Sequence, residues 1–141
     1  MAAPARLILV HKQPTSAHIH FLRFEDGIVA PVPLPKLSQV LGEEESVEDA
    51  EVVQHPAMLV GRVATELDMD AKAIRLEGDF HAHVDTPDGA AAIFLGRIDT
   101  IDLPFDVAEK AGGRFISLTE ARDLTPTELE LLRRAYICIM E

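Results

Sequence analysis

The sequence predicts an α+β fold, a three-layer α/β/α sandwich with a mixed, mainly antiparallel sheet. Two observations indicate this class. Segments with strand and helix patterns follow one another as β-rich, helix, β-rich and terminal helix, without the strict strand–helix alternation of a doubly wound sheet. The chain has 141 residues, 48% of them apolar and 26% charged, which suits one globular domain over residues 1–141.

The first third of the chain is β-rich. Residues 5–10 (ARLILV) and 17–24 (AHIHFLRF) have the composition of strands. The sequence EDG that follows is a turn signal, and residues 28–32 predict a short return strand.

A helix is predicted from Pro56 to residue 68, since proline suits the first helical position. Its apolar residues recur at helical spacing and predict a face that packs on a core. They are Leu59, Val60, Val63, Ala64 and Leu67. Arg62, Thr65 and Glu66 fall outside this stripe.

The second β-rich part covers residues 73–98. One or two strands are expected at 73–84, with a bend at Gly78. The sequence TPDG at 86–89 predicts a type I turn, and the apolar segment 90–98 predicts a central strand.

The C-terminal part contains a short strand and the last helix. A loop over 99–113 with a short helix at 107–111 precedes a strand at 114–118 and a helical turn at 119–123. Thr125 and Glu128 predict a capping box for a helix that runs to about Met140. Its predicted buried stripe is Leu129, Leu132, Ala135, Tyr136 and Ile139.

Charge and hydropathy exclude several kinds of partner. The net charge of −11 repels phosphate backbones, so we expect no binding to nucleic acid. No apolar run approaches the ~18 residues of a membrane span, so we expect no membrane partner. The single Cys138 falls in a helical apolar pattern and predicts a core thiol in a reducing, cytoplasmic environment.

The stretch from Gly42 to Asp70 concentrates negative charge. Between Glu43 and Asp70 it holds nine acidic residues and one basic residue, Arg62. Carboxylates gather in this way either to hold hard divalent cations or to keep a surface solvated.

Within this stretch, Glu48 follows Gly42 after five intervening residues, and the sequence TELDM stands at 65–69. These residues resemble the signature of the Nudix superfamily, G-x5-E-x7-R-E-U-x-E-E-x-G-U, where U is a bulky aliphatic residue. TELDM aligns with the part E-E-x-G-U. The segment RFISLTEA at 114–121 is similar to the strand and turn that end many family members. The resemblance implies a Nudix-like sandwich that would cleave a diphosphate-linked compound with Mg²⁺.

The signature departs from the family pattern at most of its charged positions. The signature Arg falls on Gly61, the first helical Glu on Arg62, the Glu pair on Thr65 and Glu66, and the Gly on Asp68. The two halves of the signature are also five residues further apart than in the family. The resemblance therefore implies a domain that has largely lost the Mg²⁺-dependent site and binds a nucleotide or another phosphorylated small molecule.

An active hydrolase is the alternative. Glu66 is then the catalytic candidate, helped by carboxylates from 43–51 or from the loop 99–106, where some family members place a catalytic base. The candidate ligand-binding residues of both hypotheses are Glu48, Arg62, Asp99 and Asp102. A structural or partner-binding protein that forms a homodimer is a further alternative.

Two His-x-His pairs predict another kind of site. Strand alternation places His18 and His20 on one face of a strand, and His81 and His83 on one face of another. If the two strands are neighbours, four imidazoles converge, which suits zinc, nickel or iron. The competing interpretation is that these histidines bind neighbouring groups or water on a polar sheet face.

Overall fold

The computed structural model describes residues 5–13, 18–35, 37–40, 56–80, 82–87, 89–100 and 104–140. The acidic run 43–51, which includes Glu48, lies outside the described residues, and so do His81 and Asp102. In the described part no helix is both long enough and apolar enough to cross a membrane.

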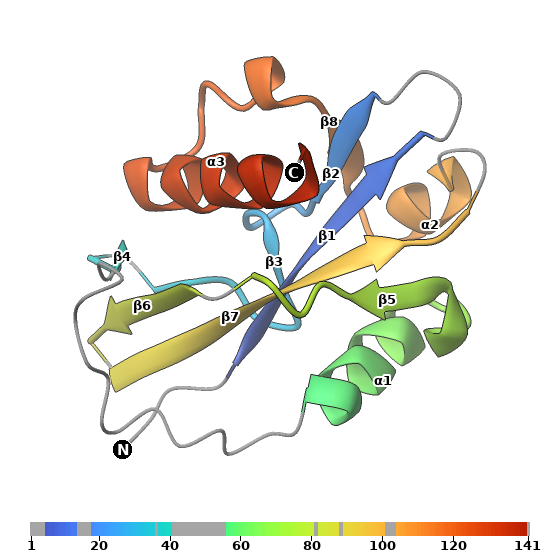
Figure 1. Ribbon diagram of the computed structural model, residues 1–141, viewed down its shortest axis with the longest axis horizontal. Coiled ribbons are helices and arrows are strands. Elements are labelled where there is room, and N and C mark those ends of the chain that lie inside the picture. The colour runs from blue at the N-terminus through green and yellow to red at the C-terminus, as the bar shows by residue number, and fades with distance from the viewer. Residues whose placement is uncertain are drawn as a thin grey trace.

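A sheet of eight strands forms the middle of the molecule (Figure 1). The strands are β1 (Arg6–Lys12), β2 (Ile19–Arg23), β3 (Val29–Ala30), β4 (Gln39–Val40), β5 (Ile74–Leu76), β6 (Ala82–Thr86), β7 (Gly89–Ile98) and β8 (Arg114–Ile116). Their order is β4-β6-β7-β1-β2-β8, while β3 pairs with β1 and β5 pairs with β7. Among the described strand pairs, β1 and β7 are parallel and the others are antiparallel, which confirms the predicted mixed, mainly antiparallel sheet.

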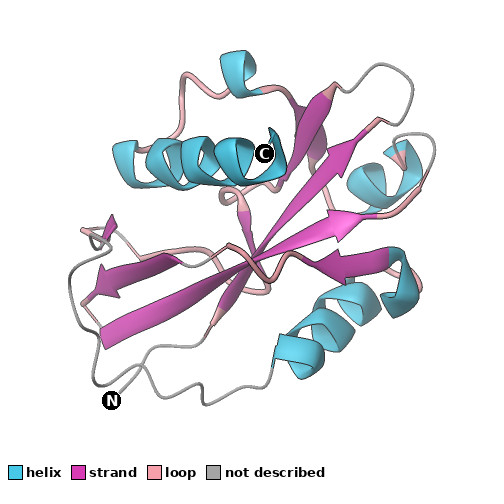
Figure 2. Ribbon diagram, in the orientation of Figure 1, coloured by secondary structure: helices cyan, strands magenta, loops and turns pink. Residues whose placement is uncertain are grey.

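Helices cover both faces of this sheet (Figure 2). They are α1 (Pro56–Glu66), α2 (Phe105–Lys110) and α3 (Pro126–Met140), with 3₁₀ turns η1 (Ala71–Ala73) and η2 (Leu118–Glu120). Helix α3 contributes to one hydrophobic cluster and helices α1 and α2 to the other. The fold is therefore the three-layer α+β sandwich that the sequence predicts.

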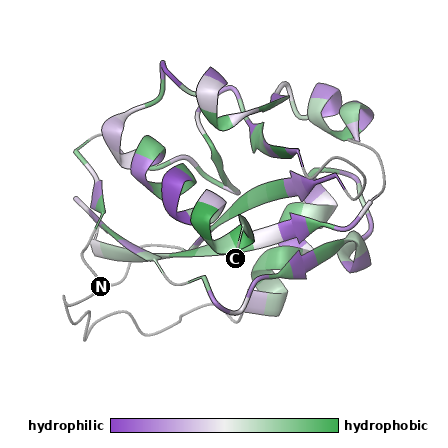
Figure 3. Ribbon diagram, turned by 45° about the horizontal axis from the view of Figure 1, so that its top comes forward, coloured by the Kyte–Doolittle hydropathy of each residue, from purple (hydrophilic) through white to green (hydrophobic). Residues whose placement is uncertain are grey.

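Strand β1 shows how the sequence builds this arrangement. Ile8 and Val10 belong to the cluster under α3, whereas Leu7 and Leu9 belong to the cluster under α1. A strand that is apolar on both faces suits the middle of a covered sheet. Figure 3 shows the corresponding pattern on the helices, where apolar (green) and polar (purple) bands alternate.

The second β-rich part contains two strands, β5 and β6. They do not pair with each other, because β7 is long enough to pair with β6 over its first half and with β5 over its second half. The chain bends between them at the predicted position, Gly78. The structure also contains the two-residue strand β4 at one edge of the sheet, which the sequence does not predict.

Candidate functional site

Helix α1 ends in a turn that contains a residue in the left-handed conformation. The amide of Met69 donates to the carbonyl of Ala64 at 2.9 Å, and the amide of Asp68 donates to that of Thr65 at 3.2 Å. This pair of bonds is a Schellman motif, which needs a residue in the left-handed conformation at the turn. Asp68 has φ of 54°, so an aspartate and not a glycine takes this conformation here.

The polar side of α1 does not carry the row of carboxylates that the signature described above would place there. Arg62 lies next to Glu66, with Nε 3.7 Å from Oε1 and both side chains 49% exposed. The Thr65 hydroxyl donates back to the carbonyl of Gly61 at 2.9 Å. The three side chains at this spacing therefore carry one positive and one negative charge, where the family pattern would carry three negative charges.

A cleft of about 250 Å³ lies between α1 and the turn that joins β2 to β3. Three carboxylates line it: Glu25 and Asp26 from the turn, and Glu66 from α1. The remaining lining residues are apolar. They are Phe24, Val29, Ala30, Pro31, Pro33, Val63, Leu67 and Ala111.

The sequence marks Glu25 and Asp26 only as a turn and does not reveal that they line the same cleft as Glu66. No local signal marks them, because the pairing of β2 and β3 with distant segments brings the turn to α1. Only the pairing of the predicted return strand with β1 would have placed Glu25 and Asp26 near α1.

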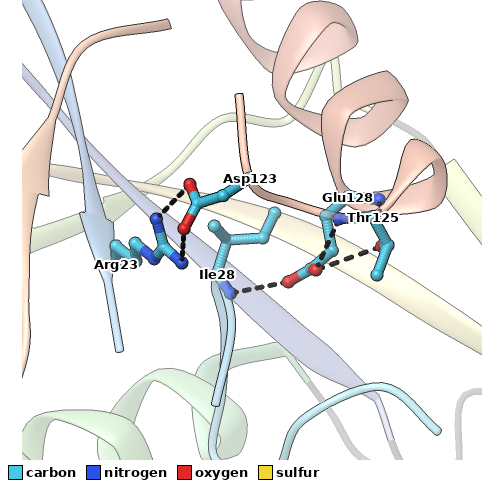
Figure 4. A network of polar contacts seen from close by, with 5 residues as sticks. All are labelled: Arg23, Ile28, Asp123, Thr125 and Glu128. Carbon is cyan, nitrogen blue, oxygen red and sulfur yellow. Dashed lines mark hydrogen bonds and ion pairs between the residues drawn. The ribbon is translucent and has the colours of Figure 1, made fainter. Parts of the chain in front are cut away.

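The turn that carries Glu25 and Asp26 is fixed from the far side of the sheet by α3 (Figure 4). Glu128 Oε2 accepts a hydrogen bond from the Ile28 amide at 3.2 Å. Its other oxygen accepts from the amide and hydroxyl of Thr125 at 3.2 and 3.0 Å, while the Glu128 amide donates to the Thr125 hydroxyl at 3.2 Å. The predicted capping box is thus confirmed, and the same carboxylate also anchors the start of β3.

An ion pair holds the end of β2 in place next to this turn. Arg23 donates two hydrogen bonds to Asp123, both 2.7 Å long (Figure 4). These bonds lower the pKa of the Asp123 carboxyl below its ordinary value. A two-pronged pair of this geometry positions the strand more firmly than a single surface contact would.

The described residues of α1 do not supply a set of carboxylate ligands for Mg²⁺. Among the residues that the structure describes, no three His, Cys, Asp or Glu side chains are grouped to hold a metal ion. On α1, the carboxylate of Glu66 is paired with a cation, and the neighbouring positions supply an arginine and a hydroxyl. This helix alone therefore does not offer several free carboxylates to a hard cation.

Asp99 lies apart from the cleft. Its carboxylate is 3.1 Å from Arg75 in an exposed pair, and its amide donates to the carbonyl of Ala73 at 2.7 Å. It is not among the described residues that line the cleft between α1 and the β2–β3 turn. The structure therefore brings Glu66 and Arg62 together but does not add Asp99 to them.

The two His-x-His strands are not neighbours, because β7 and β1 lie between β6 and β2. Strands are ~4.8 Å apart, so this order separates β6 from β2 by about 14 Å. The two histidines also lie at different levels along the strands. His83 pairs with Ala92 of β7, which is level with the start of β1, whereas His20 pairs with His11 near the end of β1. His20 and His83 therefore do not share a site, and the condition under which four imidazoles would converge, that the two strands are neighbours, is not met.

A comparison with known structures identifies a similar fold. The crystal structure of Ap4A hydrolase from C. elegans superposes with a TM-score of 0.55 and 14% sequence identity, over 97% of this chain and 98% of that one. A search with models of protein families and a comparison with curated protein sequences gave no match. The likeness establishes a Nudix-like α+β fold for this chain.

Proposed function

We propose that this chain is a Nudix-like binding domain in which the usual Mg²⁺-dependent pyrophosphohydrolase site is largely lost. The observation that carries the proposal is the Arg62–Glu66 ion pair on α1. It places a cation where the family pattern requires a carboxylate, next to the one acidic side chain that remains on this helix face. A site that activates water for attack on phosphorus needs a bound metal ion, and this arrangement does not supply its ligands.

We propose further that the cleft takes a nucleotide or a similar phosphorylated metabolite. Its apolar walls, which include Phe24, Val63 and Leu67, suit a ring system. The carboxylates of Glu25, Asp26 and Glu66 are hydrogen-bond acceptors, which suit the amino and ring N–H groups of a base.

Two cations stand near the cleft to receive the phosphates. Arg62 lies one turn before Glu66, and Lys110 precedes the lining residue Ala111 and pairs with Asp68 at 3.2 Å. Both pairs are exposed, and exposed pairs contribute only ~0–1 kcal/mol. A ligand with several negative charges would therefore compete successfully for both cations.

The experiment is a calorimetric titration with ATP and with Ap4A in EDTA. We expect binding, and we expect Arg62→Gln and Lys110→Gln each to weaken it about tenfold, since each loses a charged hydrogen bond of roughly 1.5 kcal/mol. Arg75→Gln is the matched control, because Arg75 also sits in an exposed ion pair but away from the cleft. Absence of binding by the wild type, or equal weakening by Arg75→Gln, would refute the ligand assignment.

A hydrolase with non-standard carboxylates is the second candidate function. The observation that favours it is that Glu25, Asp26 and Glu66 line one cleft although they come from distant segments. In that case Asp26→Asn and Glu66→Gln would each abolish hydrolysis of a diphosphate-linked nucleoside in Mg²⁺. If the chain is the binding domain that we propose, the wild type itself does not hydrolyse this compound, so neither substitution changes the rate.

A further inference from the structure

Three histidines lie near one another at the end of the sheet opposite to the cleft. His11 on β1 and His20 on β2 are direct partners in the antiparallel register. Side chains paired in this way have Cβ atoms ~4.5–5.5 Å apart on one face of the sheet. His18, two residues before His20, has its ring centroid 6.5 Å from that of His20 in an edge-on arrangement.

His11 is held in a defined tautomer. The residue is fully buried, and its Nε2 lies 2.8 Å from the carbonyl oxygen of Thr100. A carbonyl oxygen only accepts, so Nε2 carries the proton and Nδ1 carries a lone pair. That Nδ1 is buried without a hydrogen-bond partner. Histidines that bind metals are commonly oriented by this kind of bond from the other ring nitrogen to a backbone carbonyl.

His20 presents a second such nitrogen. Its Nδ1 is also buried without a hydrogen-bond partner. A buried ring nitrogen without a hydrogen-bond partner is available to bind a ligand.

We propose that His11, His18 and His20 form a binding site for one transition-metal cation of the Zn²⁺, Cu²⁺ or Ni²⁺ class. His11 and His20 supply two imidazole ligands from neighbouring strands, and the exposed His18 supplies the third by rotation of its side chain. The three rings do not converge on one point before this rotation, consistent with the absence of a ready-made metal group among the described residues. Imidazole nitrogen is a preferred ligand for these cations.

A cavity beside His18 and His20 leaves room for the cation, and a nearby carboxylate favours positive charge. His18 and His20 line a cavity of about 450 Å³ together with Ser117, Thr119 and Tyr136. The carboxylate of Glu120 is held by the amide and hydroxyl of Ser117, both at 3.0 Å, so it acts as a nearby negative charge and not as a ready ligand. This site is separate from the cleft at α1 and does not depend on the function proposed for it.

The test is a calorimetric titration of tag-free protein with ZnCl₂ and, separately, with CuCl₂ at pH 7.5. We expect one cation per chain, with affinity at least tenfold weaker in His20→Gln and in His18→Gln. His83→Gln is the matched control, because His83 is an equally half-buried histidine of an His-x-His pair on a separate strand, and its affinity should equal that of the wild type.

His11→Gln removes a buried side chain, so its folding is checked by circular dichroism and the proposal does not depend on it. Binding should also weaken as the pH falls from 7.5 to 5.5, because protons compete for the imidazoles. Failure of the wild type to bind either cation stoichiometrically would overturn the proposal. Unchanged affinity in His20→Gln, or equal loss in His83→Gln, would overturn it as well.

Discussion

The carboxylate of Glu128 on α3 accepts a hydrogen bond from the amide of Ile28, a residue one hundred positions earlier in the chain. The same side chain caps α3 through Thr125. The first residue after the β2–β3 turn is therefore tied to the first turn of the last helix. Since that turn carries Glu25 and Asp26 to the cleft, the geometry of the cleft depends on a helix on the opposite face of the sheet.

Replacement of Glu128 by alanine should destabilise the protein by about 2 kcal/mol. The change removes a helix cap, worth ~1 kcal/mol, and a charged hydrogen bond to a backbone amide of comparable value. Urea denaturation followed by circular dichroism measures the difference. Glu130→Ala is the control, because Glu130 makes only an i,i+4 pair with Arg134 and should cost about 0.5 kcal/mol or less. Equal losses in the two variants would contradict this role of Glu128.

Two glycine substitutions should change stability in opposite directions. Gly27 has φ of 144°, and a Cβ added there would lie 2.5 Å from Glu128 Oε2, so Gly27→Ala should cost about 1–3 kcal/mol. Gly61 lies within α1 and has open space at its Cβ position, so Gly61→Ala should stabilise by about 0.5–1 kcal/mol. Thermal and urea unfolding of both variants check this. A destabilised Gly61→Ala would show that the α1 surface is more crowded than described.

The stability of the fold should depend on His20 in weakly acidic solution. Because the pKa of His20 is lowered on folding, its contribution is complete above the unfolded value of about 6.5 and is lost as the pH falls below it. Glu120 and Asp123 also have lowered pKa values, but their ordinary values of 4.5 and 3.8 place their effect at lower pH. Unfolding free energies measured in metal-free buffer between pH 7.5 and 5 should fall in the wild type and fall less in His20→Gln. Parallel curves would contradict the assignment.

Much of the fold follows from local patterns in the sequence. The apolar stripe of α1 is buried as predicted at Leu59, Val60, Val63 and Ala64, and the α3 capping box forms at Thr125 and Glu128. These features depend on residues three or four positions apart, so the sequence displays them directly. The predicted turn before β7 and the bend near Gly78 are of the same local kind.

Long-range pairing limits what the sequence reveals. The parallel contact of β1 with β7 joins residues more than eighty positions apart, and no local pattern signals it. The same holds for the histidines: each His-x-His pair is visible in the sequence, but the order of the strands separates His20 from His83 and places His11 beside His20. The same reason applies to Glu25 and Asp26. The sequence shows that they form a turn, but it does not show that this turn lies next to α1.

We propose that this Nudix-like scaffold has no working Mg²⁺-dependent hydrolytic site. The most direct measurement is hydrolysis of Ap4A and of nucleoside diphosphate-linked compounds in excess Mg²⁺, for the wild type and for Glu66→Gln. We expect no Mg²⁺-dependent product from either protein. Turnover by the wild type that requires Mg²⁺ and disappears in Glu66→Gln would contradict it.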